Sequence, residues 1–264
     1  MRLHHVRAGS GPPLVLVHGL GGSLVNWEPV LDLLAAERDV IAVDMPGFGG
    51  SDPLPAGQRH TPVAMGAAIT AHLSGLGVER PHLAGNSLGA WVALEMAADG
   101  GAASVCAISP AGLWRAPLGP RSFDARARGK RLRPVVLAAL RTRRGRRAIL
   151  RSTAARPELL SADEAVRWVS AWLDAPSYEE ANLMMRTLTF DRADEVEVPV
   201  TIAWGGADRL VRPPRPERMP PQARYLVAEG WGHTPTRDDP EGVARLLIEA
   251  SAEEPAEPEA IRAP

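Results

Sequence analysis

The chain has 264 residues, 45% of them hydrophobic, which allows one large domain or two small ones with a sizeable core. Its formal net charge of −1 argues against a chain that binds polyanions over its whole surface. The single cysteine, Cys106, cannot form an internal disulfide, and its apolar surroundings in the sequence favour a buried thiol.

The first residues hold no apolar leader, and no window of about 18 apolar residues occurs anywhere in the chain. We therefore expect neither a signal peptide nor an integral membrane segment. A cytoplasmic protein is the default expectation.

Short apolar runs bounded by turn residues predict strands buried on both faces, as in a parallel sheet. These runs are residues 13–17, 40–43, 82–84, 104–108, 200–204 and 225–228. Helix-like stretches lie between or after them, at residues 24–35, 62–76, 88–98 and 240–250. The alternation predicts an α/β fold, with a mostly parallel central sheet and helices on both faces.

The alternation stops between residues 113 and 194, where helical patterns at 134–141, 161–173 and 178–188 occur without a strand-like run. A helical block between two strands of a sheet is typical of a cap. We therefore expect three parts: an α/β core of residues 1–112 and 195–250, a helical cap of residues 113–194, and a disordered tail of residues 251–264.

The sequence Gly85-Asn86-Ser87-Leu88-Gly89 follows one predicted strand and opens a predicted helix. In this context a G-x-S-x-G motif is typical of a nucleophile elbow, a sharp turn that exposes the serine hydroxyl above the sheet. We therefore expect Ser87 to be a nucleophile.

A serine hydroxyl needs a base to activate it, and the base needs a third group to orient it. Of the seven histidines, His233 lies in a glycine-rich loop just after the last predicted strand. Asp208 follows the strand at 200–204, whereas no carboxylate follows the preceding strand at 109–112. These positions predict His233 as the base and Asp208 as the acid, although either residue would also suit an ordinary loop.

Acyl transfer also needs N–H donors for the negative charge that develops on the substrate oxygen. The sequence His18-Gly19-Leu20-Gly21-Gly22 follows the first predicted strand and resembles an oxyanion loop. The expected donors are the backbone N–H groups of Leu20 and Leu88. A phosphate-binding loop is disfavoured, because the glycine spacing and the lysine that such loops require are absent.

Together these motifs resemble the α/β-hydrolase fold superfamily, in its capped group of serine esterases, C–C hydrolases and haloperoxidase-like enzymes. The matching segments are residues 18–22, 44–52, 85–89, 206–208 and 232–233, in the order that the superfamily uses. The resemblance implies a catalytic triad of Ser87, Asp208 and His233, and a structural role for the loop at 44–52.

Relatives that open haloalkanes or epoxides use an aspartate at the position of Ser87. The resemblance therefore implies acyl-enzyme hydrolysis of an ester, thioester, lactone or activated C–C bond, most simply by a carboxylic ester hydrolase. It implies no cofactor, and the sequence shows no metal-binding motif. The alternatives are a ligand-binding module without turnover and a biosynthetic lyase or cyclase on the same fold.

Residues 115–156 of the predicted cap contain fourteen basic residues and one acid, Asp124, a formal charge of +13. This asymmetry fits an anionic substrate, an acidic carrier protein or contact with a membrane surface, and it also fits a solvated outer face. Nucleic acid is disfavoured, because aromatic residues are not interleaved after Phe123. Trp27, Trp114 and Trp231 follow predicted strand ends and are candidates for the lining of the acyl pocket.

Overall fold

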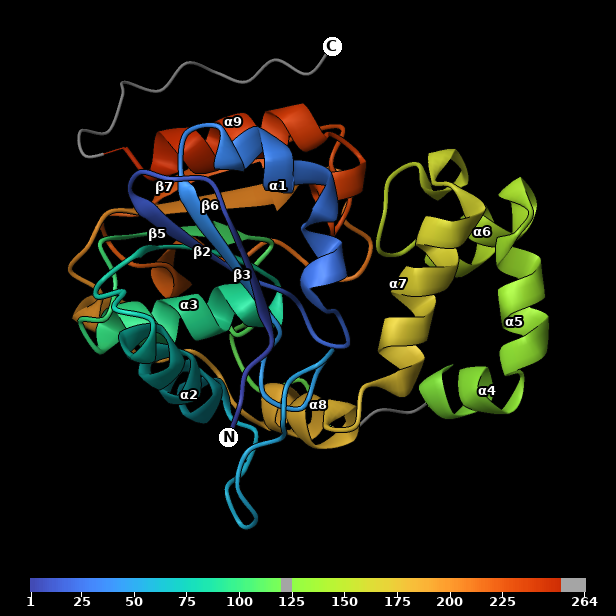
Figure 1. The fold of residues 1–264 in the computed structure, drawn as a ribbon, viewed down its shortest axis with the longest axis horizontal. Helices are drawn as coiled ribbons and strands as arrows, with labels where there is room; N and C mark the ends of the chain where they lie inside the picture. The colour runs from blue at the N-terminus through green and yellow to red at the C-terminus, as the bar shows by residue number, and fades with distance from the viewer. Residues whose placement is uncertain (120–124, 253–264) are drawn as a thin grey trace.

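The computed structural model describes residues 1–119 and 125–252. Figure 1 shows a twisted sheet between two layers of helices, with a group of helices standing to one side. The tail that the sequence predicts begins at Ser251, which is buried and accepts a hydrogen bond from the side chain of Arg38. Residues 253–264 of that tail, and cap residues 120–124, lie outside the described residues.

Seven strands of the described chain form one sheet in the order β1-β3-β2-β4-β5-β6-β7. The strands are β1 (His5–Ala8), β2 (Pro13–Val17), β3 (Asp39–Val43), β4 (His82–Asn86), β5 (Ser104–Ile108), β6 (Val200–Gly205) and β7 (Arg224–Ala228). β1 pairs with β3 in antiparallel fashion, and the other neighbours run parallel. The predicted α/β fold with a mostly parallel sheet is confirmed.

The strand β1 was not predicted from the sequence. It lies at the edge of the sheet, and its central residues Val6 and Arg7 are exposed. An edge strand that faces solvent lacks the apolar run that marks the six central and C-terminal strands.

Helices cover both faces of the sheet, as predicted. The helices of the core are α1 (Glu28–Ala35), α2 (Pro62–Gly75), α3 (Leu88–Ala98) and α9 (Pro240–Ala250). In Figure 1, α1 and α9 lie above the sheet and α2 and α3 lie below it. None of the helices in the described part of the chain is both long enough and apolar enough to cross a membrane.

Alternate residues of β2 divide the core into two clusters, because successive side chains of a strand point to opposite faces. Leu14 and Leu16 pack with residues of α1 and α9. Val15 and Val17 pack with residues of α2 and α3 on the other face. Cys106 belongs to the first cluster, and its burial raises the pKa of its thiol to about 12.

The region of the predicted cap contains α4 (Ala125–Arg131), α5 (Arg133–Leu140), α6 (Arg143–Leu150), α7 (Ala162–Asp174) and α8 (Tyr178–Thr187). Short 3-10 helices, η2 (Pro157–Leu159) and η3 (Ala193–Glu195), connect or follow them. The structure adds α4 and α6 to the helices predicted from the sequence. Both are rich in arginine. The apolar residues of α4 are only alanines, and those of α6 are the three consecutive residues 148–150 at its C-terminal end, so neither shows apolar residues spaced along a helix.

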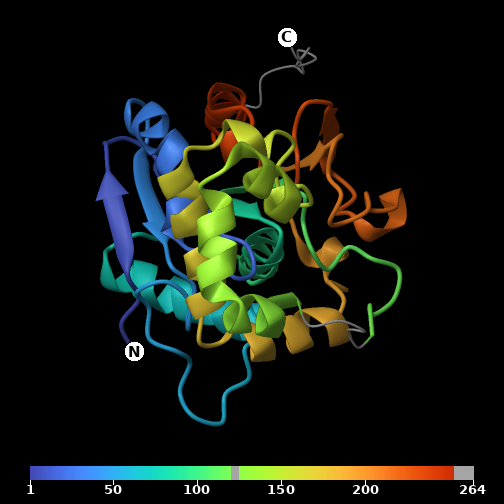
Figure 2. The ribbon, with the colours of Figure 1, turned by 90° about the vertical axis from the view of Figure 1, so that its right-hand side faces the viewer.

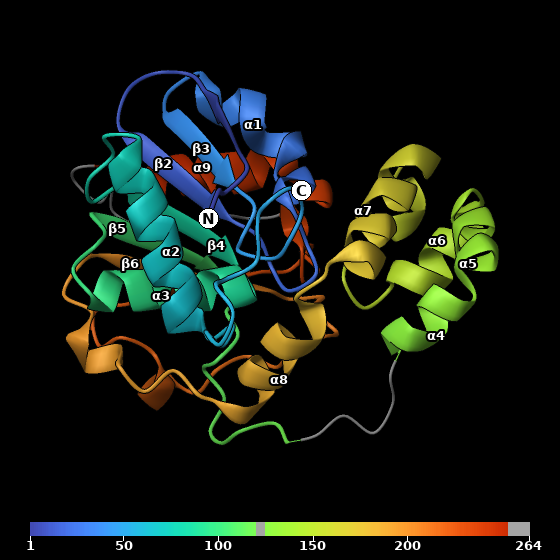
Figure 3. The same ribbon diagram turned by 60° about the horizontal axis from the view of Figure 1, so that its bottom comes forward.

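The helices of this region fall into two groups. α5, α6 and α7 enclose a small hydrophobic cluster of their own, which includes Leu140, Leu150 and Trp168. α8 instead contributes Tyr178 and Ala181 to the cluster below the sheet. Figure 2 shows α4–α7 in front of the sheet, and Figure 3 shows α8 lying between the core helices and α7.

Polar contacts join the helices of the predicted cap to the rest of the chain at two places. On one side Glu164 of α7 pairs with Arg237, which lies in η5 (Pro235–Arg237) shortly after His233. On the other side Glu180 of α8 accepts a hydrogen bond from His60 at 2.9 Å. The helices of the predicted cap are therefore held at two places, of which the contact at Arg237 lies next to the loop that carries His233.

The turn between β4 and α3 is built on two glycines. Ser87 has φ 57° and ψ −117°, a conformation that is strained for a residue with a side chain. A Cβ on Gly85 would lie 2.4 Å from the carbonyl oxygen of Gly89, and one on Gly89 would lie 2.2 Å from that of Val17. The strained turn therefore depends on the close approach of backbone to backbone at both glycines.

Replacing Gly85 by alanine should lower the free energy of unfolding by about 2 kcal/mol or more, because the methyl group must displace backbone atoms. Gly75→Ala at the end of α2 is the matched control. Nothing lies within 4 Å of a Cβ there, so the change should be about 1 kcal/mol or less. Urea unfolding measures both, and equal stability of the two variants would contradict the packing described for the turn.

Candidate active site

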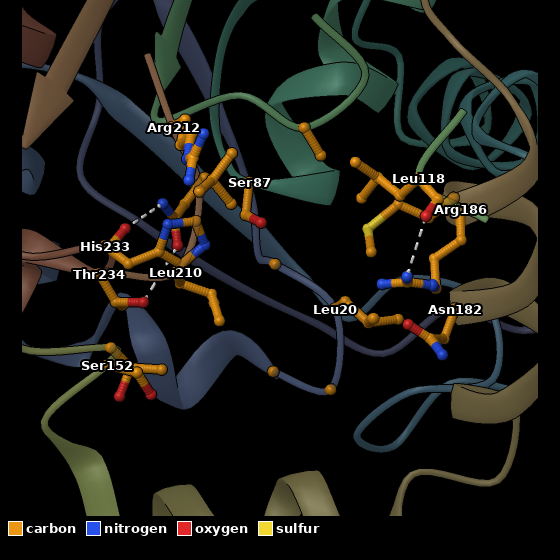
Figure 4. Close-up of a pocket in the computed structure, with 18 of the residues that line it drawn as sticks. Leu20, Ser87, Leu118, Ser152, Asn182, Arg186, Leu210, Arg212, His233 and Thr234 are labelled. Carbon is orange, nitrogen blue, oxygen red and sulfur yellow. Dashed lines mark hydrogen bonds between the residues drawn. The ribbon is translucent and has the colours of Figure 1, made fainter. Parts of the chain in front are cut away.

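Four loops meet at the carboxyl edge of the sheet, one after each of β2, β4, β6 and β7. They carry Leu20, Ser87, Asp208 and His233 respectively. Leu20, Ser87 and His233 line one cavity, in which Figure 4 shows them. In open α/β sheets this edge is where ligands bind, beside the point where the strand order reverses between β2 and β4.

The side chains of Asp208 and His233 are in direct contact. His233 Nδ1 lies 2.7 Å from Asp208 Oδ2. The other carboxylate oxygen accepts hydrogen bonds from the N–H groups of Leu210 and Val211, at 2.8 and 3.1 Å. Since the carboxylate can only accept, Nδ1 carries the proton, and Nε2 is left as the basic nitrogen of the ring.

The pKa of Asp208 reflects two opposing effects. Burial of its side chain, which is 0% exposed, raises the pKa. The hydrogen bond and charge of His233, together with the N–H groups of Val211 and Leu210, outweigh burial and lower the pKa below its ordinary value. Asp208 therefore stays ionised at neutral pH, where it can orient His233 and stabilise its protonated form.

Ser87 is joined to the histidine loop through its neighbour. The amide of Asn86 donates a hydrogen bond to the carbonyl oxygen of His233 at 2.8 Å. Among the described residues the Ser87 hydroxyl itself has no hydrogen-bond partner, and 7% of the residue is exposed. Catalytic hydrogen bonds are often unformed without substrate, so this geometry suits a nucleophile that is engaged when substrate binds.

The histidine loop is also tied to the cap. Asp238 accepts a hydrogen bond from the N–H of Gly232 at 2.8 Å, and others from the N–H groups of Ala155 and Arg156 at 2.9 and 3.2 Å. Burial raises the pKa of Asp238, and these three N–H groups offset only part of that effect. Asp238 thus joins the residue before His233 to the chain that follows α6.

The loop after β2 runs directly against the serine. A Cβ on Gly19 would lie 3.2 Å from the Cβ of Ser87. Within the described residues, the N–H groups of Leu20 and Leu88 donate no hydrogen bond to the backbone. Both N–H groups are therefore available to a ligand beside Ser87, as an oxyanion hole requires.

His18 holds this loop in place. Its Nδ1 donates to the carbonyl oxygen of Gly19 at 2.8 Å, and its Nε2 accepts from the N–H of Met45 at 3.0 Å. Complete burial lowers the pKa of His18, against smaller opposing effects of Asp44 and the Gly19 carbonyl. A neutral His18 can make both bonds at once, and this links the loop after β2 to the loop after β3.

The cavity has a volume of about 860 Å³ and lies between the core loops and the cap. Trp114, Trp168, Trp172 and Tyr178 supply most of its aromatic wall. Figure 4 shows Asn182 and Arg186 across the cavity from His233. Four arginines line it, namely Arg115, Arg186, Arg212 and Arg215, and the described lining contains no carboxylate.

Only one of the three tryptophans that the sequence predicts in the pocket lines the cavity. Trp114 lines the cavity, and so do Trp168 and Trp172. Trp27 and Trp231 are buried instead in the cluster beneath α1 and α9, on the upper face of the sheet in Figure 1. Their assignment to the pocket is therefore corrected: a place after a strand end does not determine which face of the sheet the ring packs on.

Two residues beside the site, Asn86 and Asp238, were passed over in the sequence. Asn86 was only the variable residue of the G-x-S-x-G motif. Asp238-Asp239-Pro240 looks like a helix cap, and Asp239 does cap α9 by accepting from the N–H of Gly242. Because Asp239 alone is enough to cap α9, the presence of a second carboxylate at Asp238 was the feature of the sequence that could have indicated another role.

The described residues contain no group of three or more His, Cys, Asp and Glu side chains that could hold a metal ion. The arrangement around Ser87 instead combines a hydroxyl, an oriented imidazole and free N–H donors. Nucleophilic acyl transfer requires groups of these three kinds.

Comparison with known proteins identifies the class. Residues 14–246 match the sequence model of the alpha/beta hydrolase family, and the chain belongs to this family. The predicted superfamily is therefore confirmed.

Two curated relatives illustrate the similarity. The chain is 32% identical over 257 residues to the dihydrolipoyllysine-residue acetyltransferase component of an acetoin cleaving system from Pseudomonas putida. That match covers 94% of the chain and only 65% of the longer relative. It is 30% identical over 194 residues to the epoxide hydrolase EphH of Mycobacterium tuberculosis, across 68% of the chain and 89% of the relative.

Solved structures share the fold. A thermophilic esterase from Thermogutta terrifontis, in a malate-bound structure, aligns with a TM-score of 0.69 at 24% sequence identity. The alignment covers 94% of this chain and 92% of the esterase.

Asp238→Asn should slow turnover about tenfold, because the new amide NH₂ opposes an N–H donor and displaces the loop that holds His233. The loss should fall on kcat rather than KM, and the pH profile of kcat/KM should shift. Asp163→Asn, which changes a cap carboxylate of 80% exposure, is the control and should leave both unchanged. Identical kinetics of the two variants would show that Asp238 does not position the loop.

Proposed function

We propose that the protein is a serine hydrolase that acts through an acyl-enzyme on an ester, thioester, lactone or activated C–C bond. The observation that carries this proposal is the 2.7 Å contact between His233 Nδ1 and Asp208, which leaves Nε2 as a base in the cavity that Ser87 also lines. In this proposal Ser87 is the nucleophile, His233 the general base and Asp208 the orienting acid.

The reaction begins when Ser87 Oγ attacks the carbonyl carbon of the substrate and His233 Nε2 takes the hydroxyl proton. The N–H groups of Leu20 and Leu88 bind the resulting oxyanion, and each such donor contributes about 3 kcal/mol in acyl-transfer enzymes. His233 then gives its proton to the leaving group, and the acyl-enzyme forms. A water deprotonated by His233 attacks this ester, which releases the acid and restores the serine.

The identity of the nucleophile supports acyl chemistry over epoxide opening. One relative is named an epoxide hydrolase, but superfamily members that open epoxides use aspartate where this chain has Ser87. Another is named as the acetyltransferase component of an acetoin cleaving system, and acetyl transfer is also an acyl-transfer reaction. A carboxylic ester hydrolase is the simplest form of the proposal.

Ser87→Ala should reduce turnover of p-nitrophenyl esters or thioesters by about 10³-fold or more, because no other group takes over the nucleophile's role. It should also abolish labelling by a fluorophosphonate probe. Ser152→Ala is the matched control: Ser152 lines the same cavity, and this variant should still be labelled. Saturable binding of the esters without turnover or labelling of the wild type would favour a binding module instead.

We further propose that the substrate is anionic or is delivered by an acidic carrier. The charge of residues 115–156 supports this, and so does the cavity wall, where four arginines occur without a carboxylate among the described lining residues. Positive walls of a cleft attract anions and raise their association rate.

Raising the salt concentration should therefore lower kcat/KM several-fold for an anionic ester such as p-nitrophenyl hemisuccinate, because salt screens the attraction. A neutral ester of similar size should respond little. The comparison needs only the wild-type enzyme at low and high sodium chloride. An equal response of both esters would rule out electrostatic attraction of the substrate.

A further inference from the structure

A second concave site lies where α6 and the chain that follows it face the loop after β6. It has a volume of about 390 Å³. We call it the arginine groove, and its charged lining consists of Arg144, Arg147, Arg151, Arg209 and Glu158. The formal charge of this lining is 4 − 1 = +3.

The groove is built from two distant parts of the chain. Arg144, Arg147 and Arg151 are spaced by three and four residues along α6 and its C-terminal end, so they share one helical face. Arg209 belongs to the core and comes directly after Asp208. The arginines converge although like charges on one helix face repel each other.

No described carboxylate neutralises these four side chains. All four are exposed, and none forms an ion pair or hydrogen bond with another described residue. Glu158 lies in the groove, but its only polar contact is through its carbonyl oxygen, which accepts from Arg146. The positive charge of the groove is therefore uncompensated.

Other arginines of the cap are used differently. Arg126 pairs with Glu179, and Arg133 pairs with Asp174. Arg146 is buried and donates to the carbonyl oxygen of Leu140. These three have structural partners, so the arginines of this region do not all have the same role, and Arg144, Arg147, Arg151 and Arg209 are the ones that converge on one concave site without a described partner.

The groove and the cavity of the candidate active site are lined by neighbouring residues of the same two segments. Leu150 and Ser152 line the catalytic cavity, whereas the adjoining Arg151 lines the groove. In the same way Leu210 lines the cavity and Arg209 lines the groove. An anion held between α6 and Arg209 would therefore join the cap to the core at the residue next to Asp208.

We propose that the arginine groove binds the phosphate group of a small anion, a phosphomonoester or a diphosphate. Guanidinium groups bind phosphate through paired N–H donors, and phosphate supplies several acceptor oxygens with a charge near −2. A net lining charge of +3 matches such a dianion better than a single carboxylate. The site is separate from the catalytic cavity, and its occupancy does not depend on the proposed hydrolysis.

The test is isothermal titration calorimetry of the full chain with sodium pyrophosphate, at an ionic strength kept constant with sodium chloride. The wild type should show saturable binding of one pyrophosphate per chain. Arg147→Gln and Arg209→Gln should each weaken it about tenfold, since each removes a charge-assisted contact. Arg143→Gln is the matched control, because Arg143 is an exposed arginine of α6 outside the groove, and it should have little effect.

Four results would overturn the proposal. The first is the absence of saturable pyrophosphate binding, and the second is binding of malonate as tight as that of pyrophosphate. The third is a loss of pyrophosphate affinity in Arg143→Gln equal to that in the groove variants. The fourth is a loss of affinity in Arg212→Gln while Arg209→Gln binds like the wild type. The last would place the anion in the catalytic cavity, which Arg212 lines. Thermal unfolding of each variant without ligand checks that the variants are folded.

A second measurement needs no variant. Phenylglyoxal modifies exposed arginines, and mass spectrometry locates the products. Pyrophosphate should protect the four arginines of the groove and leave Arg143 reactive. Equal modification of the groove with and without pyrophosphate would contradict the proposal.

Discussion

The candidate site depends on one buried contact, that between Asp208 and His233. The carboxylate is fully enclosed and accepts from the imidazole and two backbone N–H groups, so its charge is satisfied from three directions. This arrangement determines which ring nitrogen carries the proton. In the proposed mechanism, the positions of Ser87 and of the loop after β2 matter because Nε2 of His233 is left as the base.

The rest of the structure places Ser87, the proposed nucleophile, in the cavity that His233 also lines. Close backbone contacts at Gly85 and Gly89 produce the strained turn at Ser87. Asn86 then connects this turn to the carbonyl oxygen of His233, and Asp238 connects the same loop to the cap. The cap therefore contributes to the site as a support for the histidine loop as well as a wall of the cavity.

Motifs and strands with strong local patterns could be predicted from the sequence. The central strands, the turn at Ser87 and the places of Asp208 and His233 after strand ends follow from apolar runs and short motifs. The edge strand β1 and the arginine-rich α4 and α6 could not be predicted, because their residues lack an apolar pattern. The packing of Trp27 and the contacts of Asp238 depend on tertiary structure, which local spacing does not encode.

A double-mutant cycle tests most directly whether Ser87 and His233 act as one catalytic unit. It compares kcat/KM of the wild type, Ser87→Ala, His233→Ala and the double variant on one ester. Residues that act together are strongly non-additive, so the double variant should be no slower than the slower single variant. If the two losses instead multiply in the double variant, Ser87 and His233 act independently, which contradicts their assignment to one catalytic triad.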